Sequence, residues 1–199
     1  MNDTKEAILQ VALKLFAKDG YEAVSVSAIA GELHITKGAL YKHYKNKQDI
    51  FDSIVNRMNS MDEARAKEYA MPEGDMEEMA KGYSRISKEQ IKTYALAKFC
   101  HSTEEEFASN FRKVLTLEQY RNEKMAALYQ HYLVSGPLNY MKELFGKMTG
   151  EPAKAMQLAL DFYSPIYILY SMYDGAENKE EVLTLLKDHI DRFITKNQL

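Results

Sequence analysis

Apolar residues recur at helical spacing along almost the whole chain, and this period constrains the fold more than any other feature of the sequence. Two segments show it most clearly: Ile8, Ala12, Leu15 and Phe16 near the start, and Val182, Leu186, Ile190 and Phe193 near the end. Residues three, four and seven apart share one face of an α-helix. We found no internal repeat of 20 to 50 residues, so a repeat array is not expected. The pattern therefore predicts an all-α fold.

Local signals predict where the first helices begin and end. Gly20 is placed to end the first helix in the left-handed conformation. Ser25 is expected to cap a short helix through Leu33, and Thr36 to cap another over residues 37–44. Asn46, followed three residues later by Asp49, predicts the start of a longer helix. Four helices with tight connections would fill the first sixty residues.

Longer and more aromatic helices are predicted beyond residue 61. The expected breaks are at residues 72–74, at Gly136-Pro137 and over residues 148–152, with Ser102-Thr103 as a further helix cap. A helix over about residues 153–174 would contain Pro165. We accordingly predict a head over residues 1–46, a connecting helix over 47–60, and a body over 61–199.

The charge distribution is more informative than the formal net charge of −3. Residues 1–57 hold eight basic and seven acidic residues, whereas the remainder holds eighteen basic and twenty-two acidic ones. Residues 37–47 include four lysines and no acid. This charge pattern, a compact cationic element in a mildly acidic protein, indicates a local contact with nucleic acid and not binding over the whole protein surface.

The cellular compartment is predicted from three features. The single cysteine, Cys100, excludes an internal disulfide, the first residues lack the pattern of a signal peptide, and the longest apolar stretch is too short to span a bilayer. A cytoplasmic location is the expectation.

Two short helices joined by a three-residue turn, with Lys, His and Tyr in the second, indicate a helix-turn-helix. Gly38 and Ala39 would let the second helix approach DNA closely, and the amides after Thr36 could meet phosphate. The alternative is a solvated face with lysines for solubility.

The whole segment from Ile29 to Phe51 closely resembles the signature of the tetracycline-repressor (TetR) family, and the match extends back to Ile8. The resemblance implies a symmetric all-helical dimer with a three-helix DNA-binding head and a divergent ligand-binding body. It also implies that Leu40 and Tyr44 pack into the head. The residues expected at DNA are Ser25, Ser27, Tyr41 and Lys47 at phosphates, and Thr36, Lys37, Gly38, Ala39, Lys42 and His43 at the leading, base-proximal face. His34 departs from the family pattern, where many members have Gly.

The body is rich in tyrosine and methionine, with most of the 14 tyrosines and 11 methionines of the chain. So many hydroxyl-bearing rings fit an amphipathic ligand cavity, although a plain helical core is the simpler interpretation for each ring. The residues predicted to line a cavity are Tyr94, Phe99, Phe111, Tyr129, Tyr132, Phe162, Tyr163 and Tyr167. Those predicted at a dimer interface are Ile166, Leu169, Tyr170, Leu186, Ile190 and Phe193.

Catalytic and metal motifs are not expected. His101 and Glu105 are four residues apart and could share a helix face as metal ligands, but without a second pair a capping or solvated role is favoured. We therefore predict no enzyme activity, no metal and no cofactor. The predicted function is that of a dimeric repressor released from a palindromic operator by a small molecule. The alternatives are an activator or accessory factor of the same fold, or a helical ligand-binding protein or enzyme with a vestigial head.

Overall fold

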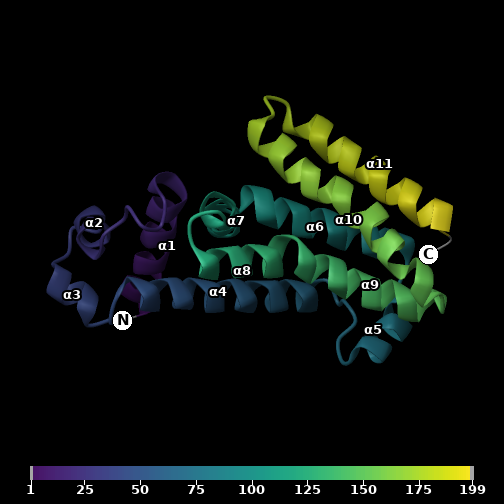
Figure 1. The fold of residues 1–199 in the computed structure, drawn as a ribbon, viewed down its shortest axis with the longest axis horizontal. Helices are drawn as coiled ribbons and strands as arrows, with labels where there is room; N and C mark the ends of the chain where they lie inside the picture. The colour runs from purple at the N-terminus through teal and green to yellow at the C-terminus, as the bar shows by residue number, and fades with distance from the viewer. Residues whose placement is uncertain (1, 198–199) are drawn as a thin grey trace. The chain divides into compact units, whose positions relative to one another are not determined.

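The computed structural model describes residues 2–197, with side chains from Thr4 onwards, and this part of the chain is helical with no strand. Its helices follow one another with short connections (Figure 1). They are α1 (Asn2–Asp19), α2 (Val26–Glu32), α3 (Lys37–Tyr41), α4 (Lys47–Glu68), α5 (Met76–Tyr83), α6 (Lys88–Glu104), α7 (Glu106–Glu118), α8 (Glu123–Leu133), α9 (Ser135–Thr149), α10 (Pro152–Gly175) and α11 (Lys179–Asn197). The predicted all-α fold is confirmed.

Most predicted helix boundaries are confirmed by specific backbone contacts. Gly20 has φ +89 and donates its N–H to the Phe16 carbonyl. Ser25 and Thr36 each accept a hydrogen bond from the amide three residues on, at 3.1 Å. Asn46 accepts from the Asp49 amide at 2.8 Å. These short polar side chains satisfy amides that the first turn of a helix leaves without partners.

Other predicted boundaries were wrong. α3 is shorter than expected and ends at Tyr41. Ser102 and Thr103 do not cap a helix, because they lie inside α6, where the Thr103 hydroxyl donates to the Phe99 carbonyl at 2.9 Å. The break comes at Glu105, between α6 and α7.

The described chain forms two compact units. The first unit comprises the residues up to Glu63 together with Glu105–Tyr129. Its core lies between α1, α2, α3, α4 and α7, and its most deeply buried residues include Ile8, Phe16, Ile29, Leu40, Phe51, Ile54, Val114 and Leu115. α7 therefore belongs with the helix-turn-helix, although the residues of α5 and α6 separate it in sequence from Glu63.

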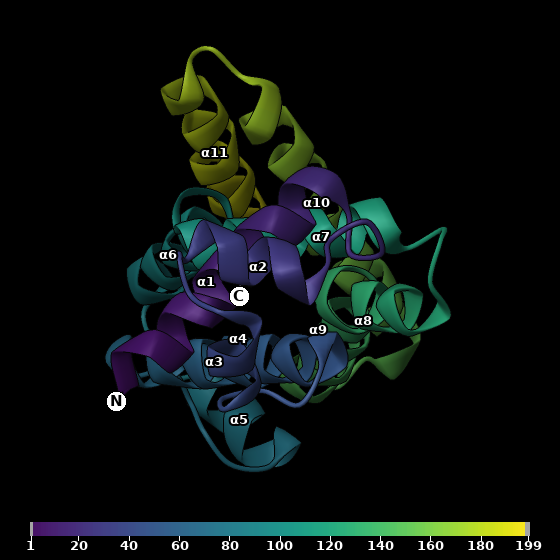
Figure 2. The same ribbon diagram turned by 90° about the vertical axis from the view of Figure 1, so that its left-hand side faces the viewer.

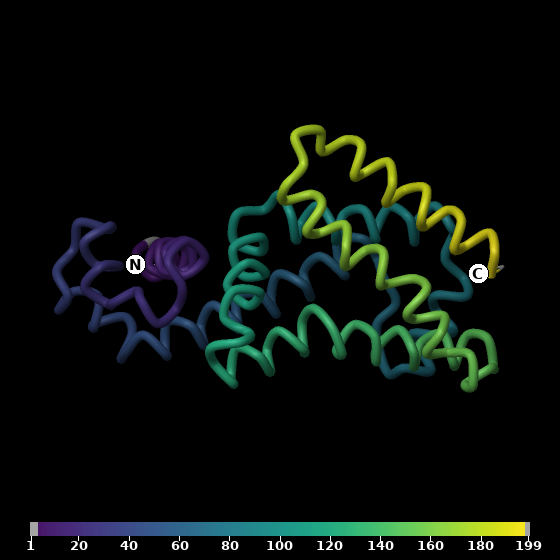
Figure 3. The backbone as a smooth tube through the Cα atoms, turned by 45° about the horizontal axis from the view of Figure 1, so that its top comes forward, coloured from purple at the N-terminus to yellow at the C-terminus, as the bar shows by residue number. Residues whose placement is uncertain are grey.

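The second unit comprises Ala64–Glu104 and the residues from Gln130 onwards. α10 packs against α9, α11 and α6, and α10 and α11 run side by side as an antiparallel pair (Figure 3). The main buried cluster contains Phe99, Tyr163, Ile166, Leu169, Tyr170, Tyr173, Val182, Leu186, Ile190 and Ile194. A smaller cluster contains Phe145, Ala159 and Phe193. α10 continues through Pro165 without a break.

Candidate nucleic-acid interface

The helix-turn-helix consists of α2, a turn over Leu33–Thr36, and α3. Ile29 and Ala30 of α2 and Leu40 of α3 are buried, and Tyr44 beyond α3 is buried with them. Packing of Leu40 and Tyr44 into the head is thereby confirmed. Because this core fixes the apolar side of α3, the opposite side of the helix faces solvent.

The exposed side of α3 and the residues directly after it carry several of the side chains that the sequence predicted at DNA. Lys37, Gly38, Tyr41 and Lys42 are exposed, while Ala39 and His43 are half-buried. Gly38 and Ala39 keep the beginning of this face small, so a partner can approach the backbone closely. The lysines bring charged donors beside that small surface, as phosphate contacts require.

The two capping hydroxyls keep a donor available. The Ser25 and Thr36 oxygens accept hydrogen bonds from Ala28 and Ala39. A hydroxyl has one donor hydrogen in addition to its acceptor lone pairs. Ser25, Ser27 and Thr36 are all exposed, so their O–H groups can donate to phosphate oxygens while two of them also hold a helix start.

His34 stands in the turn with φ +53, in the left-handed region. Its N–H donates to the Gly31 carbonyl, and the next amide, of Ile35, donates to the Ala30 carbonyl. A side chain in this conformation costs roughly 1–2 kcal/mol relative to glycine, before the entropy of a more flexible unfolded glycine is counted. His34 therefore keeps the tight turn, but its backbone is more strained than that of a glycine at this position.

Lys47, at the start of α4, is less available than the other lysines. Its side chain is only 23% exposed, and its ammonium donates to the Tyr21 carbonyl at 2.8 Å and to the Glu22 carbonyl at 3.3 Å. The same ammonium lies 4.4 Å from the centre of the Tyr21 ring. Lys47 therefore stabilises the turn between α1 and α2, besides any contact it makes with phosphate.

Tyr21 is the aromatic centre of this turn. Its ring contacts those of Phe16 and Phe51, with centroids 5.0 Å and 5.3 Å away. Burial, together with the nearby carboxylates of Glu22 and Asp52, raises the pKa of Tyr21 to about 12. Burial likewise raises the pKa of Tyr44 to about 12, with Glu6 and Asp49 adding to the effect. Both hydroxyls are therefore neutral at ordinary pH.

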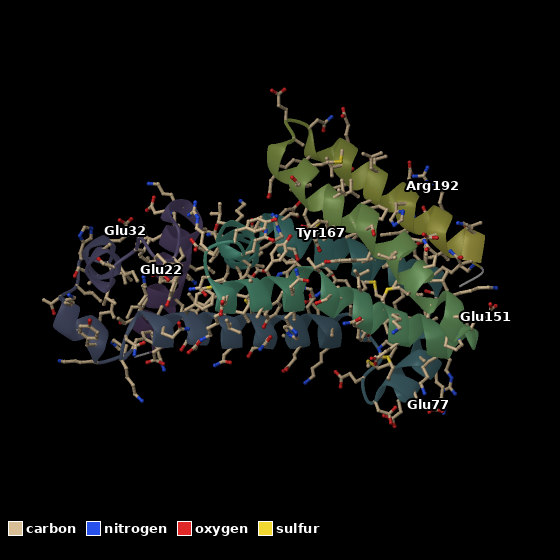
Figure 4. All side chains as sticks on the ribbon, in the orientation of Figure 1. Glu22, Glu32, Glu77, Glu151, Tyr167 and Arg192 are labelled. Atoms are coloured by element: carbon tan, nitrogen blue, oxygen red, sulfur yellow. The ribbon has the colours of Figure 1, made fainter. Side chains whose placement is uncertain are left out.

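Sequence reasoning missed the part that α7 and the start of α8 play in this unit. Glu118, at the end of α7, is buried and accepts a hydrogen bond from the Tyr21 amide at 3.0 Å. Asn122 donates to Glu22 at 3.3 Å, and Lys124 pairs with Asp52 at 2.8 Å. Figure 4 labels Glu22, which precedes α2, and Glu32, the last residue of α2. One signal was present in the sequence, because Glu118 falls on the apolar face set by the spacing of α7.

The predicted ligand-binding residues are divided between the two units. Phe111 and Tyr129 lie in the first unit and are buried there. In the second unit, the Tyr94 ring contacts Tyr69, the Phe99 ring stacks on Tyr170, and Phe162 contacts Phe145 and Phe193. Tyr163 donates its hydroxyl to the Leu133 carbonyl at 2.9 Å and has its ring near that of Tyr167, while the Tyr132 ring contacts His131.

His101 is not solvated, which corrects one of our sequence expectations. It is buried in the second unit, and its Nδ1 lies 2.6 Å from an Arg65 guanidinium nitrogen. A guanidinium can only donate, so this contact requires the ring nitrogen to accept, as in neutral histidine.

The six predicted dimer residues are also buried within the single chain, with Leu186 and Ile190 fully so. The apolar side chains that α10 and α11 do expose include Ile168, Met172 and Leu185. Figure 4 labels Tyr167 on α10 and Arg192 on α11 in the same unit.

Known proteins match the head of this chain in sequence. The family model described as "Bacterial regulatory proteins, tetR family" matches residues 8–54, which include α2, α3 and the start of α4. The tetR family model thus matches the segment whose residues resemble that family. The HTH-type transcriptional regulator YerO of Bacillus subtilis (strain 168) is 37% identical over 71 residues, 32% of this chain and 25% of that protein. The HTH-type transcriptional regulator AcrR of Shigella flexneri is 42% identical over 52 residues, 26% of this chain and 24% of that protein. The chain thus matches about a quarter of the length of these curated relatives.

A solved structure shares the fold of almost the whole chain. A transcriptional regulator from Saccharomonospora viridis, solved in complex with choline, aligns with a TM-score of 0.65 over 99% of this chain and 98% of that one, at 17% identity. Within residues 2–197, no helix is long and apolar enough to cross a membrane.

Proposed function

We propose that this chain is a sequence-specific DNA-binding transcriptional regulator in which α3 enters the major groove. The observation that carries the proposal is the division of α3 into a buried apolar side at Leu40 and an exposed side with Lys37, Gly38 and Tyr41. The exposed Lys42 follows this side directly. The relatives matched over this segment are HTH-type transcriptional regulators, which supports the same conclusion.

Selection of bound duplexes from random DNA tests the proposal. The expected result is enrichment of one sequence with two inverted half-sites, because a symmetric dimer presents two recognition helices. The matched control is a Lys37→Ala, Lys42→Ala double variant, which should enrich no sequence or a different one. Recovery of random sequence from the wild-type protein would contradict the proposal and revive a ligand-binding or enzymatic role for the body.

We further propose that a small-molecule effector controls DNA binding and that the regulator acts as a repressor. The choline bound in the Saccharomonospora viridis protein supports an effector site in the same fold without identifying the effector here. An activator of the same fold would bind upstream of the promoter, whereas a repressor would cover it. Footprinting of the selected operator on its own genome distinguishes the two.

The homodimer belongs to the same proposal, with a revised interface. The exposed apolar side chains Ile168 and Leu185 line an open groove over α10 and α11, whose lining also includes Pro165 and Arg192. Met172 is exposed four residues beyond Ile168 on α10. Exposed apolar residues on two neighbouring helices are suited to pair with the same residues of a second copy in an isologous interface. The six residues first predicted would then support that surface from below.

Signal transfer from the body to the head can follow the helices that the two units share, and these include more than the connecting helix over residues 47–60. α4 and α8 each contribute residues to both units, and α7 lies wholly in the first. Displacement of α4 or α8 by an effector would therefore reach the helix-turn-helix through continuous helix. An effector that lowers operator affinity 100-fold needs about 2.7 kcal/mol of coupling.

A further inference from the structure

Tyr44 joins the segment after the recognition helix to the first turn of α1. Its hydroxyl donates to the Lys5 carbonyl at 3.2 Å, and the Lys5 ammonium lies 5.4 Å from the centre of the Tyr44 ring. Both residues belong to the first unit, and Figure 2 shows the beginning of α1 beside α3. The Tyr44 ring is buried in the same core as Leu40, so the packing that fixes α3 also fixes the position of Lys5.

The acidic groups near Tyr44 already have other partners. The Glu6 carboxylate binds the Arg57 guanidinium at 3.0 Å, and the Asp49 carboxylate accepts a hydrogen bond from the Lys45 amide at 2.8 Å. Lys5 itself is exposed, as is Lys45, which follows Tyr44 directly. The Lys5 ammonium therefore adds its charge to the surface beyond α3, where the nearby acids are neutralised or capped.

We infer that Lys5 contacts a DNA phosphate, so that the DNA-binding surface extends from α3 across Tyr44 onto α1. The inference rests on the proposed function, and it adds a residue outside the helix-turn-helix. Phosphates flank the groove that a recognition helix enters, and a lysine ammonium on a flexible stem suits a phosphate without reading a base. Lys5 would therefore contribute to affinity for every sequence equally.

The test compares Lys5→Ala with Lys18→Ala in the full-length protein, on the duplex selected by the wild type. Both changes remove one exposed lysine from α1, but Lys18 lies at the opposite end of that helix. Lys5→Ala should lower the slope of log affinity against log salt by about 0.9, while Lys18→Ala leaves it unchanged. The affinity loss between 50 and 200 mM salt would then shrink by about 3.5-fold, with base preference unaltered.

A Lys5→Ala slope equal to that of the wild type or of Lys18→Ala would overturn the inference. Failure of the wild type to bind any duplex would instead overturn the proposed function. Tyr44→Phe keeps the ring and removes the hydroxyl bond to Lys5, so it should lower the slope part of the way. An unchanged slope in a folded Tyr44→Phe variant would overturn the anchoring role of Tyr44.

Discussion

The buried carboxylate of Glu118 accepts a hydrogen bond from the backbone amide of Tyr21, across 97 residues of sequence. This contact joins α7 to the turn that precedes the helix-turn-helix. A Cβ at Gly20 would lie only 2.8 Å from the same carboxylate. Glycine at this position therefore permits the close approach of Glu118 and also adopts the φ of +89. The two residues therefore explain why α7 belongs with the head.

Removing the carboxylate should weaken this junction. Glu118→Ala leaves the Tyr21 amide without its acceptor and should lower the free energy of unfolding by about 1–3 kcal/mol, while Glu118→Gln keeps an acceptor and costs less. Gly20→Ala should cost less in the Glu118→Ala background than in the wild type, because only backbone strain remains. Urea unfolding of the four proteins in this double-mutant cycle measures the coupling, and strict additivity would contradict the proposed contact.

Local signals allowed much of the head to be predicted, because short-range chemistry determines it. Ser25, Thr36, Asn46 and Gly20 each act within a few residues of their own position, and all four play the predicted part. The short length of α3 and the break at Glu105 were missed, since neither Gly nor Pro marks them.

Long-range packing could not be predicted in the same way. An apolar face at helical spacing shows that a residue is buried, but not whether its own chain or a second copy buries it. Leu186 and Ile190 were assigned to a dimer interface for that reason, and the chain itself covers them. The eight aromatic residues assigned to one cavity were likewise chosen by type, and they belong to both units of the structure.

Lys47 should differ from Lys37 in its effect on stability. Lys47→Ala removes two carbonyl contacts and a cation–π contact, so the free energy of unfolding should fall by about 1 kcal/mol without DNA. Lys37 is exposed on α3, and Lys37→Ala should change stability by no more than about 0.5 kcal/mol. On operator DNA, Lys37→Ala should have the larger effect on sequence specificity, because it should alter base preference by roughly 1–3 kcal/mol at one position. Equal stability of the two variants would argue against a role of Lys47 in stabilising the turn between α1 and α2.

The buried tyrosines predict a loss of stability at high pH. Tyr21 and Tyr44 have pKa values raised to about 12 in the folded protein, against 10.0 for an ordinary tyrosine. The folded state thus holds these protons more tightly, so stability is fully present below pH 10 and falls as pH rises from 10 to 12. Urea unfolding between pH 9 and 11.5 should show this decline, and Tyr21→Phe should make it less steep. A pH dependence identical in both proteins would contradict the assignment.

The revised dimer interface predicts different effects for two substitutions on neighbouring helices. Ile168 is 57% exposed, so Ile168→Glu should give a folded monomer with weak operator binding. Ile190 is fully buried, so Ile190→Glu should unfold the second unit by placing an unpaired charge in its core. Leu117→Glu, at an exposed apolar residue of α7, is the control that should remain dimeric. Sedimentation and circular dichroism distinguish these outcomes, and a dimeric Ile168→Glu protein would place the interface elsewhere.

The affinity ratio between the selected duplex and a scrambled duplex of the same composition tests DNA recognition by α3 most directly. At physiological salt the wild-type protein should bind the selected duplex at least about 1,000-fold more tightly, as specific regulators do. The Lys37→Ala, Lys42→Ala variant should lose most of that ratio while remaining folded. Equal affinity of the wild type for the two duplexes would contradict the account.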